Sequence, residues 1–227
     1  MRNFDELKSI IKGEIKENEM MSNHTYYGIG GPAEAFIVPE DKDDLSKILC
    51  YAHRYDIPAY FIGSGSNLLI SDKGIKGLVL SPRKGFKKFQ FSKSSLYAES
   101  GVMLNRIVRE SIKRNLSGLE SLIGVPGTLG GALVMNAGAF GGEISNYLRC
   151  VSIMNMKGQI ISYHPNDLDF AYRFSSFKED EFIISANFVL RNEDPKVILS
   201  NGALSSNVSA MTVYNNSDSL FNTTKEL

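Results

Sequence analysis

The chain has 227 residues, of which 43% are hydrophobic and 22% are charged, a composition typical of a folded globular protein. Its 25 lysines and arginines balance its 25 aspartates and glutamates, so the net charge argues against a nucleic-acid or membrane-surface partner. The cysteines Cys50 and Cys150 form no CxxC pair, which excludes a dense disulfide framework and the usual zinc-site spacing. No apolar run has the length of a signal peptide core or a membrane span, so we expect a cytoplasmic protein.

Hydrophobic spacing predicts alternating helices and strands in the first half of the chain. Leu7, Ile10, Ile11 and Ile15 lie at helical spacing, which predicts an amphipathic helix within an N-terminal unit of residues 1–22. The further elements expected here are a strand at 35–38, a helix at 42–55, and strands at 59–62, 68–70 and 77–80.

The second half continues the pattern and then loses it. The elements expected are a strand at 96–99, a helix at 102–115, and strands at 151–154, 160–163 and 182–190. Residues 193–227 are rich in serine, threonine and asparagine and show no such period, which predicts a poorly ordered polar tail. The chain is thereby divided into the units 1–22, 23–82, 83–192 and 193–227.

The first candidate site is a glycine loop that follows the strand predicted at 59–62. It consists of Gly63, Ser64, Gly65, Ser66, Asn67 and Leu68. Positions without a side chain let backbone N–H groups turn toward an anion, and the hydroxyls add hydrogen bonds, so the loop could hold a pyrophosphate. The Rossmann pattern is absent because Leu68 stands where its third glycine would be, and an ordinary tight turn remains the alternative.

The second candidate is a segment of very small residues that begins with a proline. Its notable positions are Gly124, Pro126, Gly127, Gly130, Asn136, Ala137, Gly138 and Ala139. Proline suits the first turn of a helix, whose free N–H groups suit a phosphate, and the glycines would allow a ligand to approach the backbone. The alternative is a smooth helix face that packs on a sheet.

The third candidate combines a phenol, a guanidinium and hydroxyls at Tyr172, Arg173 and Ser175. Arginine can hold a carboxylate or a phosphate through two parallel hydrogen bonds, although such a stretch is also typical of a solvated loop. The histidines His24, His53 and His164 share no ligand spacing, so we expect no metal site and interpret them as solvated or capped side chains.

Together these motifs resemble the family of UDP-N-acetylenolpyruvoylglucosamine reductases. The matching segments, in order, are 24–33, 63–74, 118–139 and 172–175. The resemblance implies an α+β, FAD-binding fold of the PCMH or vanillyl-alcohol-oxidase type, with the flavin between two α+β subdomains. It also implies NADPH as hydride donor and a nucleotide-sugar substrate that is reduced to UDP-N-acetylmuramate for peptidoglycan synthesis.

By the same resemblance, residues 63–68 and the segment from Gly124 to Gly130 surround the FAD pyrophosphate. Residues 136–139 would then lie near the ribityl chain or the isoalloxazine ring. Arg173 corresponds to the family's catalytic arginine, and Tyr172 and Ser175 would contact the substrate.

The family continues into a third domain that supplies a proton-donating serine and a glutamate, and the resemblance here ends near residue 192. Two alternatives to the full reductase therefore stay open. The chain could be a flavin-binding fragment, or another FAD-dependent oxidase or dehydrogenase on the same fold.

Overall fold

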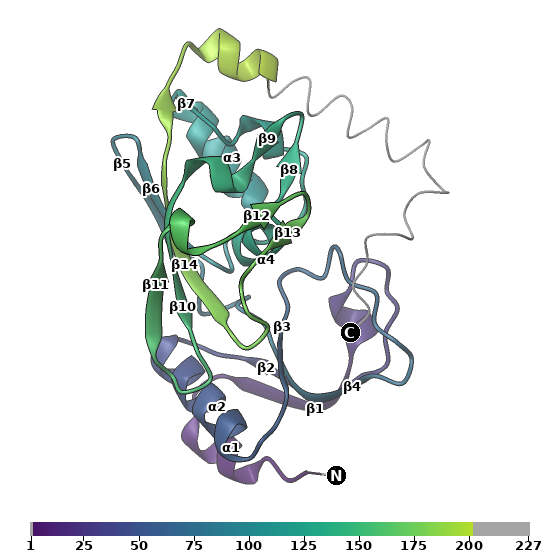
Figure 1. Ribbon diagram of the computed structural model, residues 1–227. Helices are drawn as coiled ribbons and strands as arrows, with labels where there is room; N and C mark the ends of the chain where they lie inside the picture. The colour runs from purple at the N-terminus through teal and green to yellow at the C-terminus, as the bar shows by residue number, and fades with distance from the viewer. Residues whose placement is uncertain (1, 202–227) are drawn as a thin grey trace.

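A four-stranded sheet with the order β1-β2-β4-β3 forms the lower part of the molecule in Figure 1, a computed structural model that describes residues 2–201. Its strands are β1 (Glu14–Met20), β2 (Pro32–Val38), β3 (Ala59–Phe61) and β4 (Ile75–Leu80). β1 runs antiparallel to β2, whereas β2 and β3 both run parallel to β4. α1 (Asp5–Ile10) and α2 (Lys42–Arg54) pack beside this sheet.

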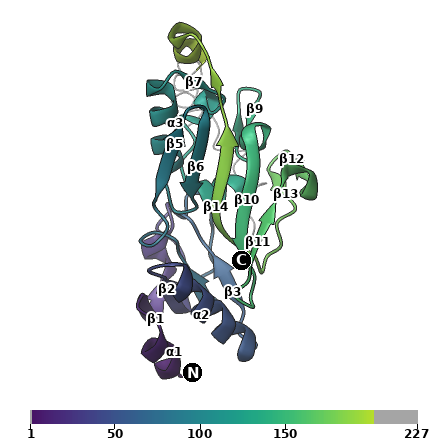
Figure 2. The ribbon, with the colours of Figure 1, turned by 90° about the vertical axis from the view of Figure 1, so that its left-hand side faces the viewer.

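A second sheet rises above the first, and Figure 2 shows its strands side by side. Its order is β11-β10-β14-β6-β5, and every neighbouring pair is antiparallel. The strands are β5 (Phe89–Ser92), β6 (Ser95–Glu99), β10 (Leu148–Met154), β11 (Ile160–Tyr163) and β14 (Phe182–Val189). α3 (Leu104–Lys113) and α4 (Leu129–Val134) bury their apolar residues against this sheet.

Short strands and 3-10 turns lie between and after the strands of the two sheets. They are the strands β7 (Leu116–Ser117), β8 (Gly138–Ala139), β9 (Gly142–Glu143), β12 (Phe170–Ala171), β13 (Phe174–Ser175) and β15 (Arg191–Asn192). The 3-10 turns are η1 (Met21–His24), η2 (Glu120–Leu122), η3 (Ile144–Tyr147) and η4 (Pro165–Asp167). Among residues 2–201, no helix has the length and apolar character needed to cross a membrane.

One hydrophobic core joins the two sheets. Phe182, at the start of β14, makes an edge-to-face contact with Phe61 at 5.1 Å and a tilted contact with Phe86 at 5.5 Å between ring centroids. Met154 and Ile184 enter the same core, which also holds the apolar face of α2. Because aromatic pairs stabilise beyond their buried area, this cluster fixes the second sheet against the end of β3, where the glycine loop begins.

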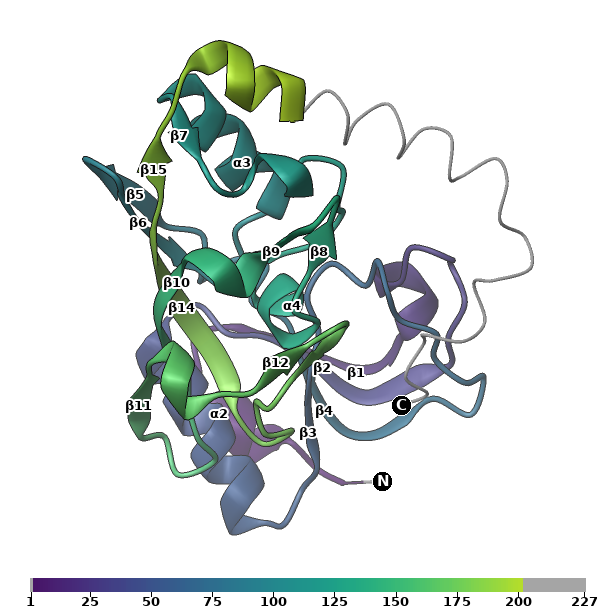
Figure 3. The same ribbon diagram turned by 45° about the horizontal axis from the view of Figure 1, so that its top comes forward.

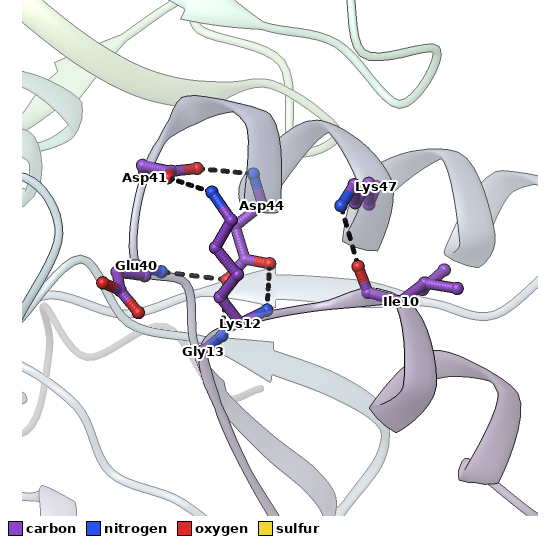
Figure 4. Close-up of polar contacts among 7 residues, drawn as sticks. All are labelled: Ile10, Lys12, Gly13, Glu40, Asp41, Asp44 and Lys47. Carbon is purple, nitrogen blue, oxygen red and sulfur yellow. Dashed lines mark hydrogen bonds and ion pairs between the residues drawn. The ribbon is translucent and has the colours of Figure 1, made fainter.

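A buried carboxylate holds the start of α2 against the turn that precedes β1 (Figure 4). Asp44 accepts hydrogen bonds from the backbone N–H groups of Lys12 and Gly13, both at 2.8 Å, and of Glu40 at 3.0 Å. Asp41 caps the helix by accepting from the backbone N–H of Asp44 at 2.8 Å. Charged hydrogen bonds of this kind are stronger than neutral ones, so Asp44 ties three chain segments together.

Most elements expected from the sequence are present, but two of the predictions are wrong. Residues 14–20 form the strand β1 instead of extending the N-terminal helix, because pairing with β2 outweighs a weak helical pattern. Residues 68–70 do not form the expected strand. The strand β5 was not expected, since its two phenylalanines alternate over only four residues.

The polar tail begins with more order than the sequence predicts. Residues 195–201 are helical, and Ile198 is fully buried there. β15 pairs with β7 just before this helix, so the chain beyond residue 190 stays attached to the segment that follows α3. The rest of the predicted tail, 202–227, lies outside the described residues.

Candidate functional site

The glycine loop leaves β3 and folds back over the first sheet. Gly65 has φ +70°, a left-handed conformation that glycine adopts without strain. A Cβ at this position would overlap the backbone oxygen of His24, and the Gly65 oxygen accepts a hydrogen bond from the Tyr26 N–H at 3.0 Å. The sequence requires glycine here because another chain segment passes directly behind the loop.

A second segment, residues 126–128, faces this loop from the start of α4, which packs on the second sheet. The Ser66 hydroxyl lies 3.4 Å from the Pro126 backbone oxygen and 3.4 Å from the Ser64 hydroxyl. A Cβ on Gly127, which has φ +129°, would lie 3.4 Å from the Ser66 hydroxyl oxygen. A Cβ on Gly63 would overlap the Thr128 hydroxyl. We call residues 63–67 together with 126–128 the cradle.

The helix next to the cradle is shorter than the sequence predicts. Pro126 does not begin it; α4 starts at Leu129, and the Thr128 hydroxyl accepts from the Gly131 N–H at 3.5 Å. Gly130 has a packing role, because a Cβ there would lie 3.0 Å from the Ser100 Cβ. Gly131 and Gly124 are exposed, so the open side of this segment carries little side-chain bulk.

His24 and Arg83 lie behind the glycine loop. The His24 ring stacks on Phe36 with centroids 3.9 Å apart, its Nε2 lies 2.8 Å from a Glu19 oxygen, and its Nδ1 lies 3.2 Å from an Arg83 nitrogen. Since the Arg83 guanidinium can only donate, we assign the proton of a neutral ring to Nε2. Of the two alternatives expected for the histidines, solvated or capped, His24 therefore fits the second, because both of its ring nitrogens have partners. Within residues 2–201, no carboxylate pairs with Arg83, which leaves a cation near the loop.

The residues after α4 divide between the core and the surface. Asn136 is buried with φ +40°, and Ala137 is buried in the core of the second sheet. Gly138 and Ala139 form β8, which pairs with β9 and is half-buried. Ala137 therefore supports the segment from below, while Gly138 and Ala139 are accessible to a ligand.

Tyr172 and Arg173 form the tip of the hairpin between β12 and β13, which lies beside α4 in Figure 3. Tyr172 is 80% exposed, and the Arg173 guanidinium carbon lies 5.6 Å from its ring centroid. No carboxylate in the described part of the chain forms an ion pair with Arg173. Ser175 is buried, and its hydroxyl donates to the Val134 oxygen at 2.6 Å. The hairpin thus presents an unpaired cation beside an exposed phenol.

A charged carboxylate anchors the chain that leads into the cradle. Burial raises the pKa of Glu120, but hydrogen bonds from the Gly118 N–H, its own N–H, the Ser117 hydroxyl and the Asn201 amide lower that pKa below its ordinary value. The Ser117 bond measures 2.8 Å and the Asn201 bond 3.4 Å. Glu120 is therefore ionised at neutral pH and holds both this turn and the helix at 195–201.

The cradle fits the pyrophosphate of a dinucleotide cofactor. Gly63, Gly65 and Gly127 leave backbone free of side chains where a Cβ would fill the space or approach a hydroxyl. The hydroxyls of Ser64 and Ser66 provide donors on one side, and Arg83 provides positive charge nearby. Backbone N–H groups, hydroxyls and a guanidinium are the groups that bind phosphate oxygens in proteins. Within residues 2–201, no group of His, Cys, Asp and Glu side chains has the arrangement of a metal site.

Both sides of the cradle carry recognisable sequence motifs, but not all of its supports do. Thr128 follows the Val-Pro-Gly segment directly, and His24 opens the first matching motif, so both had a signal in the sequence. Arg83 had none, because it lies in the connection between the two sheets and reaches His24 only in the folded chain.

Residues 33–163 match the family described as FAD binding domain. The chain belongs to this family. It is also 39% identical over 170 residues to the UDP-N-acetylenolpyruvoylglucosamine reductase of Syntrophomonas wolfei, and 38% identical over 192 residues to that of Exiguobacterium sibiricum. These alignments cover 75% and 84% of this chain, which confirms the resemblance that the motifs indicate.

The alignments cover 57% and 63% of the two relatives, so the chain spans about six tenths of their length. The crystal structure of the reductase from Thermus caldophilus superposes with a TM-score of 0.75 at 27% identity and covers 88% of this chain and 70% of that one. BBE-like 1 of Physcomitrella patens, with a TM-score of 0.65 at 12% identity, covers 84% of this chain and 45% of its own length and shows the fold alone. The predicted PCMH-type FAD-binding fold is confirmed.

Proposed function

We propose that this chain binds FAD with its pyrophosphate in the cradle. The observation that carries the proposal is the meeting of two glycine-containing loops, residues 63–67 after β3 and residues 126–128 before α4, in a member of the FAD-binding domain family. Backbone N–H groups of 63–67 and the hydroxyls of Ser64 and Ser66 would hold the phosphates. Residues 136–139 would lie along the ribityl chain or the isoalloxazine ring, and the division into flavin-binding units at 23–82 and 83–192 follows from this placement.

We further propose that the chain belongs to an NADPH-dependent reductase that converts UDP-N-acetylglucosamine enolpyruvate to UDP-N-acetylmuramate, a cytoplasmic step of peptidoglycan precursor synthesis. Bound FAD would supply the hydride transfer from NADPH to the enolpyruvyl double bond. The unpaired guanidinium of Arg173 would hold the substrate carboxylate and stabilise the charge that develops as the hydride arrives. Tyr172 would contact the substrate from the same hairpin tip.

A flavin-binding fragment without reductase activity is the second candidate. It is favoured by the length of the match, because the reductases of Syntrophomonas wolfei and Exiguobacterium sibiricum extend well beyond the part that this chain covers. The two candidates share the cofactor and differ in turnover. The same preparation therefore decides between them.

The purified chain, incubated with FAD and then desalted, is expected to retain the visible absorption bands of flavin. Anaerobic addition of NADPH should bleach these bands, and the enolpyruvyl nucleotide should restore them if the chain is a complete reductase. Bleaching without restoration would identify the flavin-binding fragment. Desalted protein without flavin would contradict both candidates.

Arg173→Ala is expected to retain FAD but to slow restoration of the flavin bands by the substrate about 100-fold, the usual effect of removing one charge-stabilising group. FAD should be retained because Arg173 lies on the hairpin and makes no hydrogen bond to the cradle. Restoration should slow because the variant lacks the guanidinium proposed to hold the substrate carboxylate. Where turnover is too slow to follow, the substrate Kd read from the flavin spectrum should rise instead. Arg54→Ala, an exposed arginine on α2, is the control, and loss of flavin from Arg173→Ala would contradict the assigned role.

A further inference from the structure

Two side-chain hydrogen bonds run in opposite directions between the segment after the cradle and the arginine hairpin. The Ser175 hydroxyl of β13 donates to the Val134 oxygen, the last residue of α4, at 2.6 Å. In return, the Asn136 amide donates to the Ala171 oxygen of β12 at 3.1 Å. We call these four residues the clasp. It joins two motifs that lie about 35 residues apart in the sequence.

The Asn136 side chain is held through its amide nitrogen, whereas its buried Oδ1 has no hydrogen-bond partner within residues 2–201. Its amide nitrogen also donates to a Glu143 carboxylate oxygen at 2.8 Å, and the residue is 1% exposed. Its φ of +40° is rare for residues other than glycine, and asparagine tolerates it best. A rare backbone conformation held by two hydrogen bonds from one amide indicates that the orientation of this side chain matters.

The Arg173 side chain, by contrast, has no carboxylate partner within residues 2–201, and its φ is +56°. Its position therefore depends on the backbone of the hairpin. Both strands of that hairpin are held by the clasp, one through the Ala171 oxygen and the other through the Ser175 hydroxyl. Movement of α4 would consequently move the arginine.

We propose that Ser175 and Asn136 are positioning residues that couple the cradle to Arg173, so that a ligand which orders the cradle also orders the arginine hairpin. The inference rests on the FAD site proposed above. It gives Ser175 a role different from substrate contact, because its hydroxyl is buried against Val134. If an ordered cradle favours the ordered hairpin by a given coupling free energy, an ordered hairpin favours ligand binding at the cradle by the same amount.

Hydrogen exchange of backbone amides tests the coupling. In the apo protein, amides of 170–175 are expected to exchange about tenfold faster in Ser175→Ala, the size expected from one buried hydrogen bond. Amides of 131–135, at the end of α4 and its C-cap, should exchange faster as well. Ser175→Thr, which keeps the hydroxyl, should restore the slow rates.

Ser176→Ala is the matched control, since its hydroxyl accepts only the local Asp169 N–H at 2.8 Å. Asn136→Gly is the second variant, because glycine accepts φ +40° without strain and removes the amide. FAD should slow exchange of 170–175 in the wild type. Ser175→Ala should bind FAD within about threefold of the wild-type Kd and lose that protection.

Equal exchange of 170–175 in the wild type and both variants would overturn the proposal, as would full FAD protection in Ser175→Ala. If the wild type binds no FAD, the cofactor proposal fails separately. The apo rates in 131–135 and 170–175 then still decide whether the clasp couples the two segments.

Discussion

Gly65→Ala is expected to weaken FAD binding about 100-fold or more while leaving the chain folded. The residue has φ +70°, which costs an alanine roughly 1–2 kcal/mol, and the new Cβ would overlap the His24 oxygen. Relief of the overlap must shift the loop, because His24 is held by Glu19, Arg83 and the Phe36 ring. A charge-assisted hydrogen bond contributes about 1.5–3 kcal/mol, so losing two predicts a rise in the FAD Kd of about 100-fold or more.

Fluorescence titration of flavin checks this value, and thermal unfolding of the apo protein checks the fold. Gly28→Ala is the matched control, because Gly28 has φ +65° and nothing lies within 4 Å of its added Cβ. Gly28→Ala has the same kind of backbone strain but no overlap of its Cβ with another atom, so it should keep most of the affinity for FAD. Wild-type affinity in Gly65→Ala would mean that the glycine loop does not hold the cofactor.

Local patterns explain why much of this fold was predictable. The acids Asp41, Asp43 and Asp44 precede an apolar stripe, and α2 begins at Lys42 as expected. β14 alternates apolar residues and was expected within one residue of its observed end. Both elements are specified by neighbours along the chain, so their sequence period reports their structure directly.

Features that depend on distant partners were beyond the sequence. β1 carries charged residues and becomes a strand because β2 pairs with it, and Ile198 is buried because β15 first pairs with β7. The same holds at the candidate site, where the sequence indicated the glycines for their missing side chains. The sequence did not reveal that the Asn136 amide donates to the Ala171 oxygen, because a contact between distant residues leaves no periodic pattern in the sequence.

Asp44→Ala is expected to lower the free energy of unfolding by about 3 kcal/mol or more, the largest stability effect of any change considered for this chain. The carboxylate is 1% exposed, and its removal leaves the N–H groups of Lys12, Gly13 and Glu40 without their acceptor. Urea unfolding followed by circular dichroism measures the change.

Two further variants separate the charge from the geometry. Asp43→Ala removes an exposed acid from the first turn of the same helix and should cost about 0.3–1 kcal/mol. Asp44→Asn keeps one acceptor oxygen, which can serve Gly13 and Glu40, but turns an amide N–H toward the Lys12 N–H, so its loss should fall between the two. Equal stability of Asp44→Ala and Asp43→Ala would mean that the segments before β1 and α2 are held by apolar packing instead of by this carboxylate.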